Sequence, residues 1–139
     1  YALGQLVGQG SFGIVFACQA TNSSDDVAAE RPLVVKLVDK VEMLPEDIER
    51  EIMIQRRLDH PNIVKVHAVI DEKCFVCIVM DRFVGGDLVK LLQQHVSSGQ
   101  RLRTSSIVRL AKQMMEAIAY MHSQSIAHRD IKADNYLVD

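Results

Sequence analysis

The segment His128-Arg129-Asp130-Ile131-Lys132-Ala133-Asp134-Asn135 lies near the carboxyl end of the chain and is followed by the apolar residues Tyr136-Leu137-Val138. It gathers histidine, arginine, lysine, aspartate and asparagine side chains into one short stretch. A solvated loop rarely ends in a run that apolar, and a structural turn does not need this many ionisable groups. The segment is therefore the strongest candidate for a functional site, and the rest of the chain is interpreted outward from it.

Helical patterns precede this segment. Apolar residues recur at helical spacing between Thr104 and His122 and predict one long helix. A shorter helix is predicted to run through about His95, with Asp87 as its N-cap. Residues 97–99 are predicted to form the loop between the two helices.

The first half of the chain carries strand patterns. A helix is predicted to begin at Pro45, and the turn His60-Pro61-Asn62 is predicted to end it. The polar stretch at residues 21–26 is expected to be a loop. Strands are predicted over residues 1–7, 14–20, 33–38, 64–70 and 75–81. One helix among strands, followed by helices, predicts two substructures hinged near residues 82–86.

Composition places the chain among ordinary globular proteins. It has 139 residues, of which 48% are hydrophobic and 24% charged, and a net charge of −2. No basic patch indicates nucleic acid, and the longest apolar run, Cys74 to Met80, is too short to cross a bilayer. Three cysteines predict structural thiols in a reducing cytoplasmic or nuclear setting, because no second Cys/His pair has zinc spacing.

A glycine-rich run, Gly8-Gln9-Gly10-Ser11-Phe12-Gly13-Ile14-Val15, joins the first two predicted strands. Its glycines let the backbone approach phosphate oxygens without a Cβ in the way. The pattern also fits a dinucleotide site or a plain hairpin turn. A dinucleotide site is disfavoured, because the next segment is a strand rather than a helix and no acidic residue follows in a βαβ frame.

Lys36 interrupts the apolar strand Leu33 to Val38. A lysine among apolar neighbours is costly unless it is paired or solvated, so it either holds a phosphate beside an acid or reaches water from a sheet edge. Glu51 is a candidate partner, because it shares an inward side of the predicted helix with Ile48. The alternative is a solvated glutamate that pairs only with a neighbour such as Arg50.

Taken together, these motifs resemble the serine/threonine branch of the eukaryotic-type protein kinases. Residues 128–135 match the family's H-R-D-x-K-x-x-N catalytic loop, and the other motifs precede it in the family's order across essentially the whole chain. The resemblance implies a protein-kinase-like two-lobed fold of class α+β. It implies a small antiparallel β-sheet lobe with one helix at residues 1–81, a hinge at 82–86, and the start of a mainly helical lobe at 87–139.

The resemblance implies an enzyme that uses ATP and Mg²⁺ to phosphorylate serine and threonine hydroxyls of protein substrates. Lys36 is implied to contact the α- and β-phosphates and to pair with Glu51. Asp130 is implied to accept the proton of the substrate hydroxyl, and Lys132 to lie near the transferred phosphate. Asn135 is implied to hold one Mg²⁺.

Nucleotide binding is assigned by the resemblance to a larger set of residues. The glycine-rich loop covers the phosphates, the gatekeeper residue precedes a hinge whose backbone meets adenine, and Asp87 lies at the ribose end. The implied nucleotide-binding residues are Gly8, Gly10, Ser11, Phe12, Gly13, Val15, Val34, Lys36, Met80 (the gatekeeper), Asp81, Phe83, Asp87 and Leu137.

Three features depart from the family pattern. Val34 stands where alanine is usual, which implies a slightly tighter adenine pocket. Gln55 stands where a leucine commonly packs in a regulatory hydrophobic stack, so the active state is expected to be less self-sufficient and to be supported by bound water or an activator protein. The chain reaches Asp139 without an Asp-Phe-Gly segment, so residues 1–139 by themselves are expected to be inactive and to expose apolar helix surface.

The main alternative is a pseudokinase, which is an ATP-binding scaffold or regulator with a kinase fold. It is disfavoured because Lys36, Glu51, Asp130 and Asn135 are all present, and a scaffold has no physical need for all four. A small-molecule phosphotransferase is disfavoured by the spacing of Lys132 after Asp130.

Overall fold

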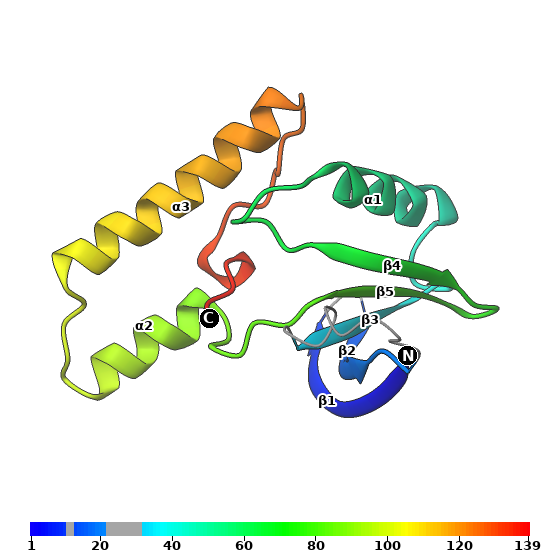
Figure 1. Ribbon diagram of the computed structural model, residues 1–139, viewed down its shortest axis with the longest axis horizontal. Coiled ribbons are helices and arrows are strands. Elements are labelled where there is room, and N and C mark those ends of the chain that lie inside the picture. The colour runs from blue at the N-terminus through cyan, green and yellow to red at the C-terminus, as the bar shows by residue number, and fades with distance from the viewer. Residues whose placement is uncertain (11–12, 22–31) are drawn as a thin grey trace. The chain divides into compact units, whose positions relative to one another are not determined.

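The computed structural model describes residues 1–10, 13–21 and 32–139 of the chain (Figure 1). Its strands and helices confirm the predicted α+β class. In chain order the elements are β1 (Ala2–Gly10), β2 (Gly13–Gln19), β3 (Leu33–Asp39), α1 (Pro45–Arg57), β4 (Val66–Asp71), β5 (Phe75–Asp81), α2 (Leu88–Ser97), α3 (Thr104–Ser123) and the 3₁₀ turn η1 (Ala133–Asn135).

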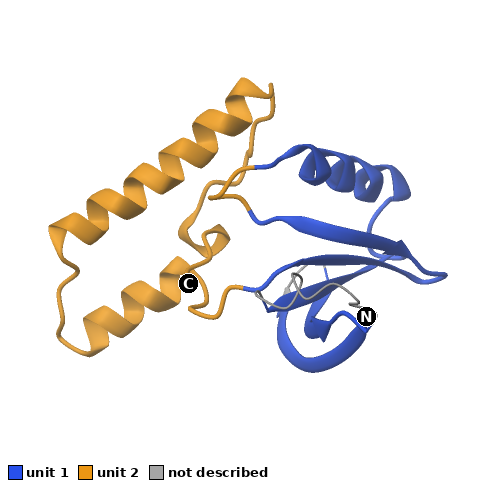
Figure 2. Cartoon of the chain, in the orientation of Figure 1, with its two compact units in different colours: residues 1–59, 64–82 blue, residues 60–63, 83–139 orange. Residues whose placement is uncertain are grey.

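The chain divides into two compact units, which Figure 2 shows in different colours. Unit 1 comprises residues 1–59 and 64–82 and contains the strands and α1. Unit 2 comprises residues 60–63 and 83–139 and contains α2, α3 and η1.

Unit 1 is built on a five-stranded antiparallel sheet, with the order β1-β2-β3-β5-β4 among its described residues. β5 lies between β3 and β4, and its Ile78 and Val79 are only 1% and 0% exposed. Alternate residues of a strand point to opposite faces, so these two neighbours belong to different cores. The core with α1 consists of Val38, Ile48, Val76 and Ile78, and the core on the other face consists of Cys18, Val35 and Val79.

Helix α1 begins at Pro45, as predicted, because proline needs no amide hydrogen bond at the first helical position. Glu46 and Asp47 lie in the first turn, where acidic side chains are favoured. The helix ends at Arg57, before the predicted stop at His60. Leu58 adopts an extended conformation there, and its side chain is buried.

The turn His60-Pro61-Asn62 belongs to unit 2 and packs on α3. The rings of His60 and Tyr120 are stacked with centroids 5.0 Å apart, and Asn62 Nδ2 donates to Glu116 Oε2 at 3.3 Å. Because this turn is folded, β4 begins at Val66 rather than at residue 64.

In unit 2, the predicted cap of α2 is confirmed. Asp87 Oδ1 accepts a hydrogen bond from the Lys90 amide at 2.8 Å. The helix extends through Ser97, which was predicted to be loop, because the Ser98 amide still donates to the Gln94 carbonyl. Gly99 follows with a positive φ of 65°, a conformation that favours glycine.

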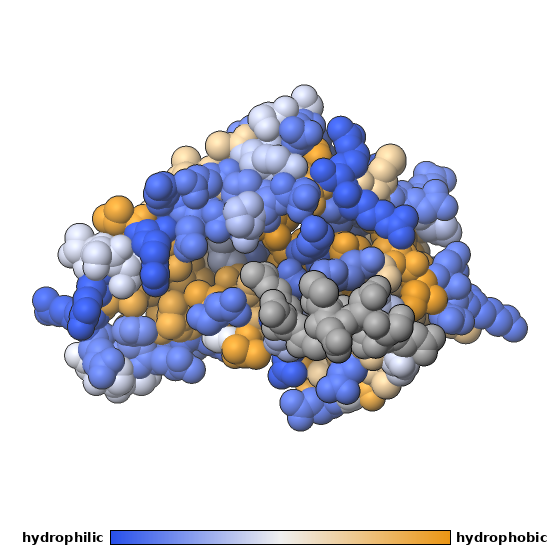
Figure 3. Space-filling view, viewed as in Figure 1, coloured by the Kyte–Doolittle hydropathy of each residue, from blue (hydrophilic) through white to orange (hydrophobic). Residues whose placement is uncertain are grey.

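Helix α3 buries Ala117 and Met121 but leaves several apolar side chains exposed, among them Val108 and Met115 at 61% and 62%. This confirms the expected exposure of apolar helix surface. On the face shown in Figure 3, hydrophobic residues lie among hydrophilic ones. No helix in the described part of the chain is long and apolar enough to span a membrane.

The glycine-rich run differs from a simple turn. β1 continues through Gly10 and β2 begins at Gly13, and these two glycines pair across the hairpin. Ser11 and Phe12 lie outside the described residues, as does the predicted loop beyond residue 21.

We predict that Gly13→Ala lowers the stability of the full-length protein by about 2 kcal/mol or more. Gly13 has a φ of 137°, and a Cβ there would lie 2.1 Å from the Leu37 carbonyl oxygen. The matched control is Gly8→Ala, because a Cβ at Gly8 meets nothing within 4 Å. Chemical unfolding measures both variants, and equal stability of the two would contradict the prediction.

Candidate functional site

One face of the unit 1 sheet gathers four residues of the candidate site. Val15 lies opposite Lys36 in the β2–β3 pair, and Val34 lies opposite Met80 in the β3–β5 pair. Residues directly opposite each other in antiparallel strands point to the same face. Lys36 also lies opposite Ile78, which belongs to the core with α1. The register therefore places one lysine among three apolar side chains on the face that carries α1.

Lys36 and Glu51 are brought together. Lys36 Nζ lies 3.3 Å from Glu51 Oε1, and the two side chains are 22% and 33% exposed. The alternative pairing of Glu51 with Arg50 is not formed, because Arg50 donates to Asp47 instead. Glu51 on α1 thus holds the ammonium group of Lys36. Because both side chains are partly desolvated, their electrostatic attraction is stronger than that of a pair at the surface.

The described glycines of the glycine-rich run have different roles. Gly13 is required by the backbone itself, because Leu37 leaves no room for a side chain. Gly8 lies opposite Val15 and faces open space. An open position of this kind leaves room for a bound group to approach the backbone.

In unit 2, three residues of the catalytic-loop segment form one cluster. Asn135 Nδ2 donates to the Asp130 carbonyl oxygen at 2.7 Å and to Asp130 Oδ2 at 3.0 Å. Lys132 Nζ lies 3.0 Å from the same Oδ2. The Asp130 amide donates to His128 Nδ1 at 3.3 Å, and Arg129 has a positive φ of 63°. The turn η1 brings Asn135 back to Asp130 and so assembles the cluster.

These contacts change the acidity of Asp130. The hydrogen bond from Asn135, then that from Lys132, lowers the pKa of the Asp130 carboxyl below its ordinary value, because both stabilise the ionised form. The carboxylate is exposed to solvent, with 62% of its side chain accessible. Asp130 is therefore an accessible, ionised carboxylate at neutral pH.

Asp87 and Leu137 are neighbours in unit 2, because they form an antiparallel bridge. The chain on either side continues this pairing: the Gly85 amide donates to the Val138 carbonyl at 2.9 Å, and the Val138 amide donates to the Gly86 carbonyl at 2.8 Å. A Cβ at Gly85 would lie 2.6 Å from the Val138 oxygen. Gly85, which lies within the predicted hinge at residues 82–86, thus lets the chain around Val138 approach closely.

Other predicted residues are placed differently. Phe83 opens the second segment of unit 2 and is partly buried, whereas Asp81 ends β5 in unit 1 and is buried. The Asp81 carboxylate lies 2.7 Å from His67 Nε2, a contact that sequence analysis missed. The candidate residues therefore form one group in unit 1 and another in unit 2. The group in unit 1 comprises Gly8, Gly10, Gly13, Val15, Val34, Lys36, Glu51, Met80 and Asp81, and the group in unit 2 comprises Phe83, Asp87, Asp130, Lys132, Asn135 and Leu137.

Gln55 has an incomplete environment on α1. Its Oε1 atom is buried and has no hydrogen-bond partner among the described residues. A buried acceptor without a donor costs about 1–3 kcal/mol. The residue that departs from the kinase pattern thus also leaves one buried acceptor of α1 without a donor among the described residues.

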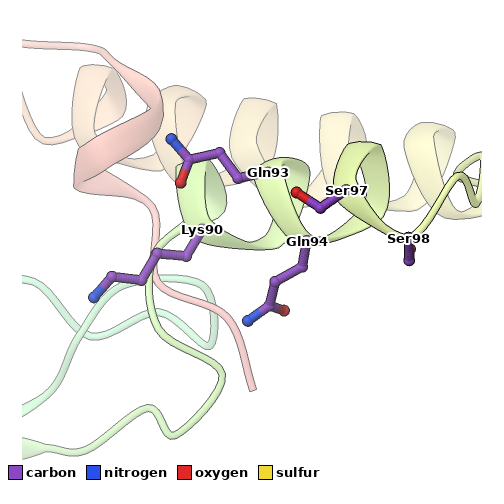
Figure 4. A pocket seen from close by; sticks show the side chains of 5 residues that line it. All are labelled: Lys90, Gln93, Gln94, Ser97 and Ser98. Atoms are coloured by element: carbon purple, nitrogen blue, oxygen red, sulfur yellow. The ribbon is translucent and has the colours of Figure 1, made fainter.

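Two further features carry no assigned chemistry. An open hollow along α2 is lined by Lys90, Gln93, Gln94, Ser97 and Ser98 and contains none of the predicted site residues (Figure 4). Burial raises the pKa of the Cys18 and Cys77 thiols, which opposes thiolate chemistry there. The described residues contain no cluster of three or more His, Cys, Asp or Glu side chains able to hold a metal ion.

Comparison with known proteins gives one consistent result. The family model described as "Protein kinase domain" matches residues 1–139. CBL-interacting protein kinase 25 of Oryza sativa subsp. japonica is 38% identical over 144 residues, which cover 100% of this chain and 27% of that protein. CBL-interacting serine/threonine-protein kinase 21 of Arabidopsis thaliana is 34% identical over 143 residues, which cover 100% and 32%. The chain thus spans only a minor part of the length of these relatives.

We predict that Asn135→Ala raises the pKa of the Asp130 carboxyl toward its ordinary value. The first cause of the lowered pKa is the hydrogen bond from Asn135, which alanine cannot make. Because the folded-state pKa is lowered, the contribution of this cluster to stability is present above the unfolded pKa and is lost as pH falls through the folded value. In Asn135→Ala, Asp130 therefore takes up its proton at higher pH than in the unchanged protein.

Carboxyl NMR titration of Asp130 in the full-length protein measures this shift. Asn62→Ala is the matched control, because Asn62 bonds to Glu116 and not to Asp130. A titration curve of Asp130 that is the same in Asn135→Ala as in the unchanged protein would refute the assignment.

Proposed function

The chain belongs to the protein kinase family, and from this premise we propose that the full-length protein transfers the γ-phosphoryl group of ATP to serine and threonine hydroxyls of protein substrates. The observation that carries the proposal is the cluster of Asp130, Lys132 and Asn135. It joins an ionised, exposed carboxylate to a lysine and an amide within one short loop. Two of the relatives are named serine/threonine-protein kinases, which supports the choice of hydroxyl.

Asp130 is proposed to be the group that orients the substrate hydroxyl and accepts its proton. Asn135 donates one hydrogen bond to the Asp130 carboxylate and one to the Asp130 carbonyl oxygen, so the Asp130 side chain is oriented before a substrate arrives. Its lowered pKa keeps it ionised at neutral pH. Lys132 Nζ, at 3.0 Å from the carboxylate, supplies a positive charge close to where the substrate hydroxyl is proposed to attack the phosphoryl group.

Lys36 is proposed to bind the α- and β-phosphates. The contact with Glu51 fixes the position of the ammonium group while leaving donors for phosphate oxygens, since a lysine carries three. The apolar side chains of Val15, Val34 and Met80 share its sheet face, and adenine is proposed to pack beside them. The mixture of one cation and apolar surface fits a nucleotide better than it fits a purely apolar ligand.

The residues present also fit Mg²⁺. Mg²⁺ prefers oxygen ligands, and the bonds of Asn135 to Asp130 use only Nδ2, which leaves its Oδ1 for a cation. ATP supplies the phosphoryl group, and Mg²⁺ neutralises its charge during transfer. Residues 1–139 contain Asn135 but no Asp-Phe-Gly segment, so we propose that they do not catalyse transfer by themselves.

An activator protein is part of the proposal. The relatives are named for interaction with CBL, and a partner of that kind is proposed for this protein. The buried, unpaired Oε1 of Gln55 supports it, because an unsatisfied buried acceptor makes the packed position of α1 less stable. A partner that orders α1 would offset this loss of stability.

Transfer of phosphate from Mg-ATP to a mixed peptide pool tests the main proposal. In the full-length protein, Asp130→Asn is expected to lower kcat by about 100-fold or more, because the amide cannot accept a proton. The matched control is Asp71→Asn, an exposed carboxylate paired with Lys40 at the end of β4, for which little change is expected.

The outcomes separate the candidate functions. Phosphoserine or phosphothreonine that disappears in Asp130→Asn and persists in Asp71→Asn supports the proposal. A folded, activator-saturated protein that binds ATP but transfers no phosphate would favour the pseudokinase.

A second test concerns Gln55. We predict that Gln55→Leu raises basal activity without an activator by about fivefold, because removing the unpaired acceptor is worth about 1 kcal/mol to the ordered helix. Met53→Leu, at an exposed position of the same helix, is the control. Basal activity that stays the same in Gln55→Leu would remove the link between this residue and activation.

A further inference from the structure

Asp81 is a buried charged residue whose side chain the proposed mechanism does not use. Its side chain is only 10% exposed, and its Oδ1 lies 2.7 Å from His67 Nε2. An ionised carboxylate can only accept hydrogen bonds, so Nε2 of His67 carries the proton in this contact. Burial of a carboxylate is costly unless it has donors, and His67 is one partner that meets this cost.

A bulge in β4 presents His67 to Asp81. Val66 lies opposite Met80, but the next pair is Ala68 with Val79, so His67 is an extra residue without a partner in the register. A β-bulge of this kind changes the direction of a side chain. The irregular register thus accompanies the contact between the His67 ring and the Asp81 carboxylate.

The same place is the last point at which unit 1 holds the chain. The Asp81 amide donates to the Lys65 carbonyl at 3.2 Å, and the Arg82 amide donates to the Pro32 carbonyl at 2.8 Å. After Arg82 the chain enters unit 2. The His67 contact and the pairing of Asp81 with Leu33 of β3 add to these backbone bonds in fixing this end of β5.

The Asp81 side chain does not share the nucleotide-binding face proposed above. Asp81 alternates with Met80 along β5 and therefore points to the opposite face, together with the buried Val79. Only its backbone, not its carboxylate, is available on the side of Lys36. The contact with His67 can therefore influence a nucleotide only by fixing the backbone.

We propose that His67 is a positioning residue for the nucleotide, which acts through the carboxylate of Asp81 to hold the backbone of residues 81–82. This inference rests on the proposed ATP binding and adds to it a residue on the far face of the sheet. Because the amides of Asp81 and Arg82 already donate to Lys65 and Pro32, adenine is proposed to bond to the remaining backbone groups beside them. Because hydrogen bonds to a ring edge need donor and acceptor within a few tenths of an ångström, a loosened strand end weakens nucleotide binding.

The test compares two substitutions of similar length in the full-length protein. His67→Met removes the donor, whereas His67→Gln keeps an N–H that can reach the carboxylate. We expect the Kd for a non-hydrolysable ATP analogue to rise about tenfold in His67→Met and by no more than about threefold in His67→Gln. The KM for the peptide substrate is expected to stay the same in both variants. His122→Met, at an exposed position in the last turn of α3, is the control.

Each outcome decides the proposal. A lower melting temperature of His67→Met with an unchanged Kd for the analogue means that His67 only stabilises the fold, and this overturns the inference while the proposed function stands. Equal loss of nucleotide and peptide affinity overturns it too. Failure of the unchanged, folded protein to bind the analogue overturns both the proposed function and the inference that rests on it.

A second comparison covers the case in which His67→Met does not fold. Asp81→Asn keeps an acceptor for His67 but removes the buried charge, so adding His67→Met to it leaves no uncompensated carboxylate. We expect the double variant to bind the analogue roughly threefold more weakly than Asp81→Asn alone. Equal affinity of these two proteins would overturn the proposal.

Discussion

The structure of unit 1 depends on the antiparallel pairing of β3 with β5. The register runs from Leu33 opposite Asp81 to Asp39 opposite Phe75. Because side chains alternate along a strand, this register alone places Lys36 on the face of α1 and sends the Asp81 side chain to the other face. A shift by one residue would exchange the two faces and bury the lysine in the core of Val35 and Val79. The buried side chains on both faces of β5 therefore fix the register, and the register fixes the faces on which Lys36 and Asp81 lie.

The two groups of functional residues use different electrostatic means. Lys36 and Glu51 lie in a partly desolvated place, where each charge needs the other, so the pair reports whether α1 is docked on the sheet. Asp130 is exposed, and its acidity is set by local hydrogen bonds from Asn135 and Lys132 instead. Movement of α1 would break the contact between Lys36 and Glu51. The second group is formed by side chains that lie within eight residues of one another in the chain.

Much of this could be predicted from sequence, because the signals are local. The apolar run along residues 75–80 predicts β5, proline at position 45 predicts the start of α1, and Asp87 before an apolar run predicts the start of α2. The contact of His67 with Asp81 could not be predicted, because it depends on a bulge between strands, and a register shift has no local sequence signature. The unpaired oxygen of Gln55 likewise depends on what α1 packs against. Glycines at positions 8 to 13 indicated a turn, yet two of them end strands that pair.

These misses share a physical origin. Hydrophobic periodicity reports which face of an element is buried, but it does not report how polar atoms on that face are satisfied. Asp81 alternates with Met80 like any strand residue, and from the sequence alone its charge predicts an exposed end of β5. Its burial becomes evident only when β5 lies between β3 and β4. A buried carboxylate is kept only where the surrounding donors hold it well, so its position is as strongly determined as that of an apolar core residue. The polar end of β5 is thus as much a part of the framework as its apolar centre.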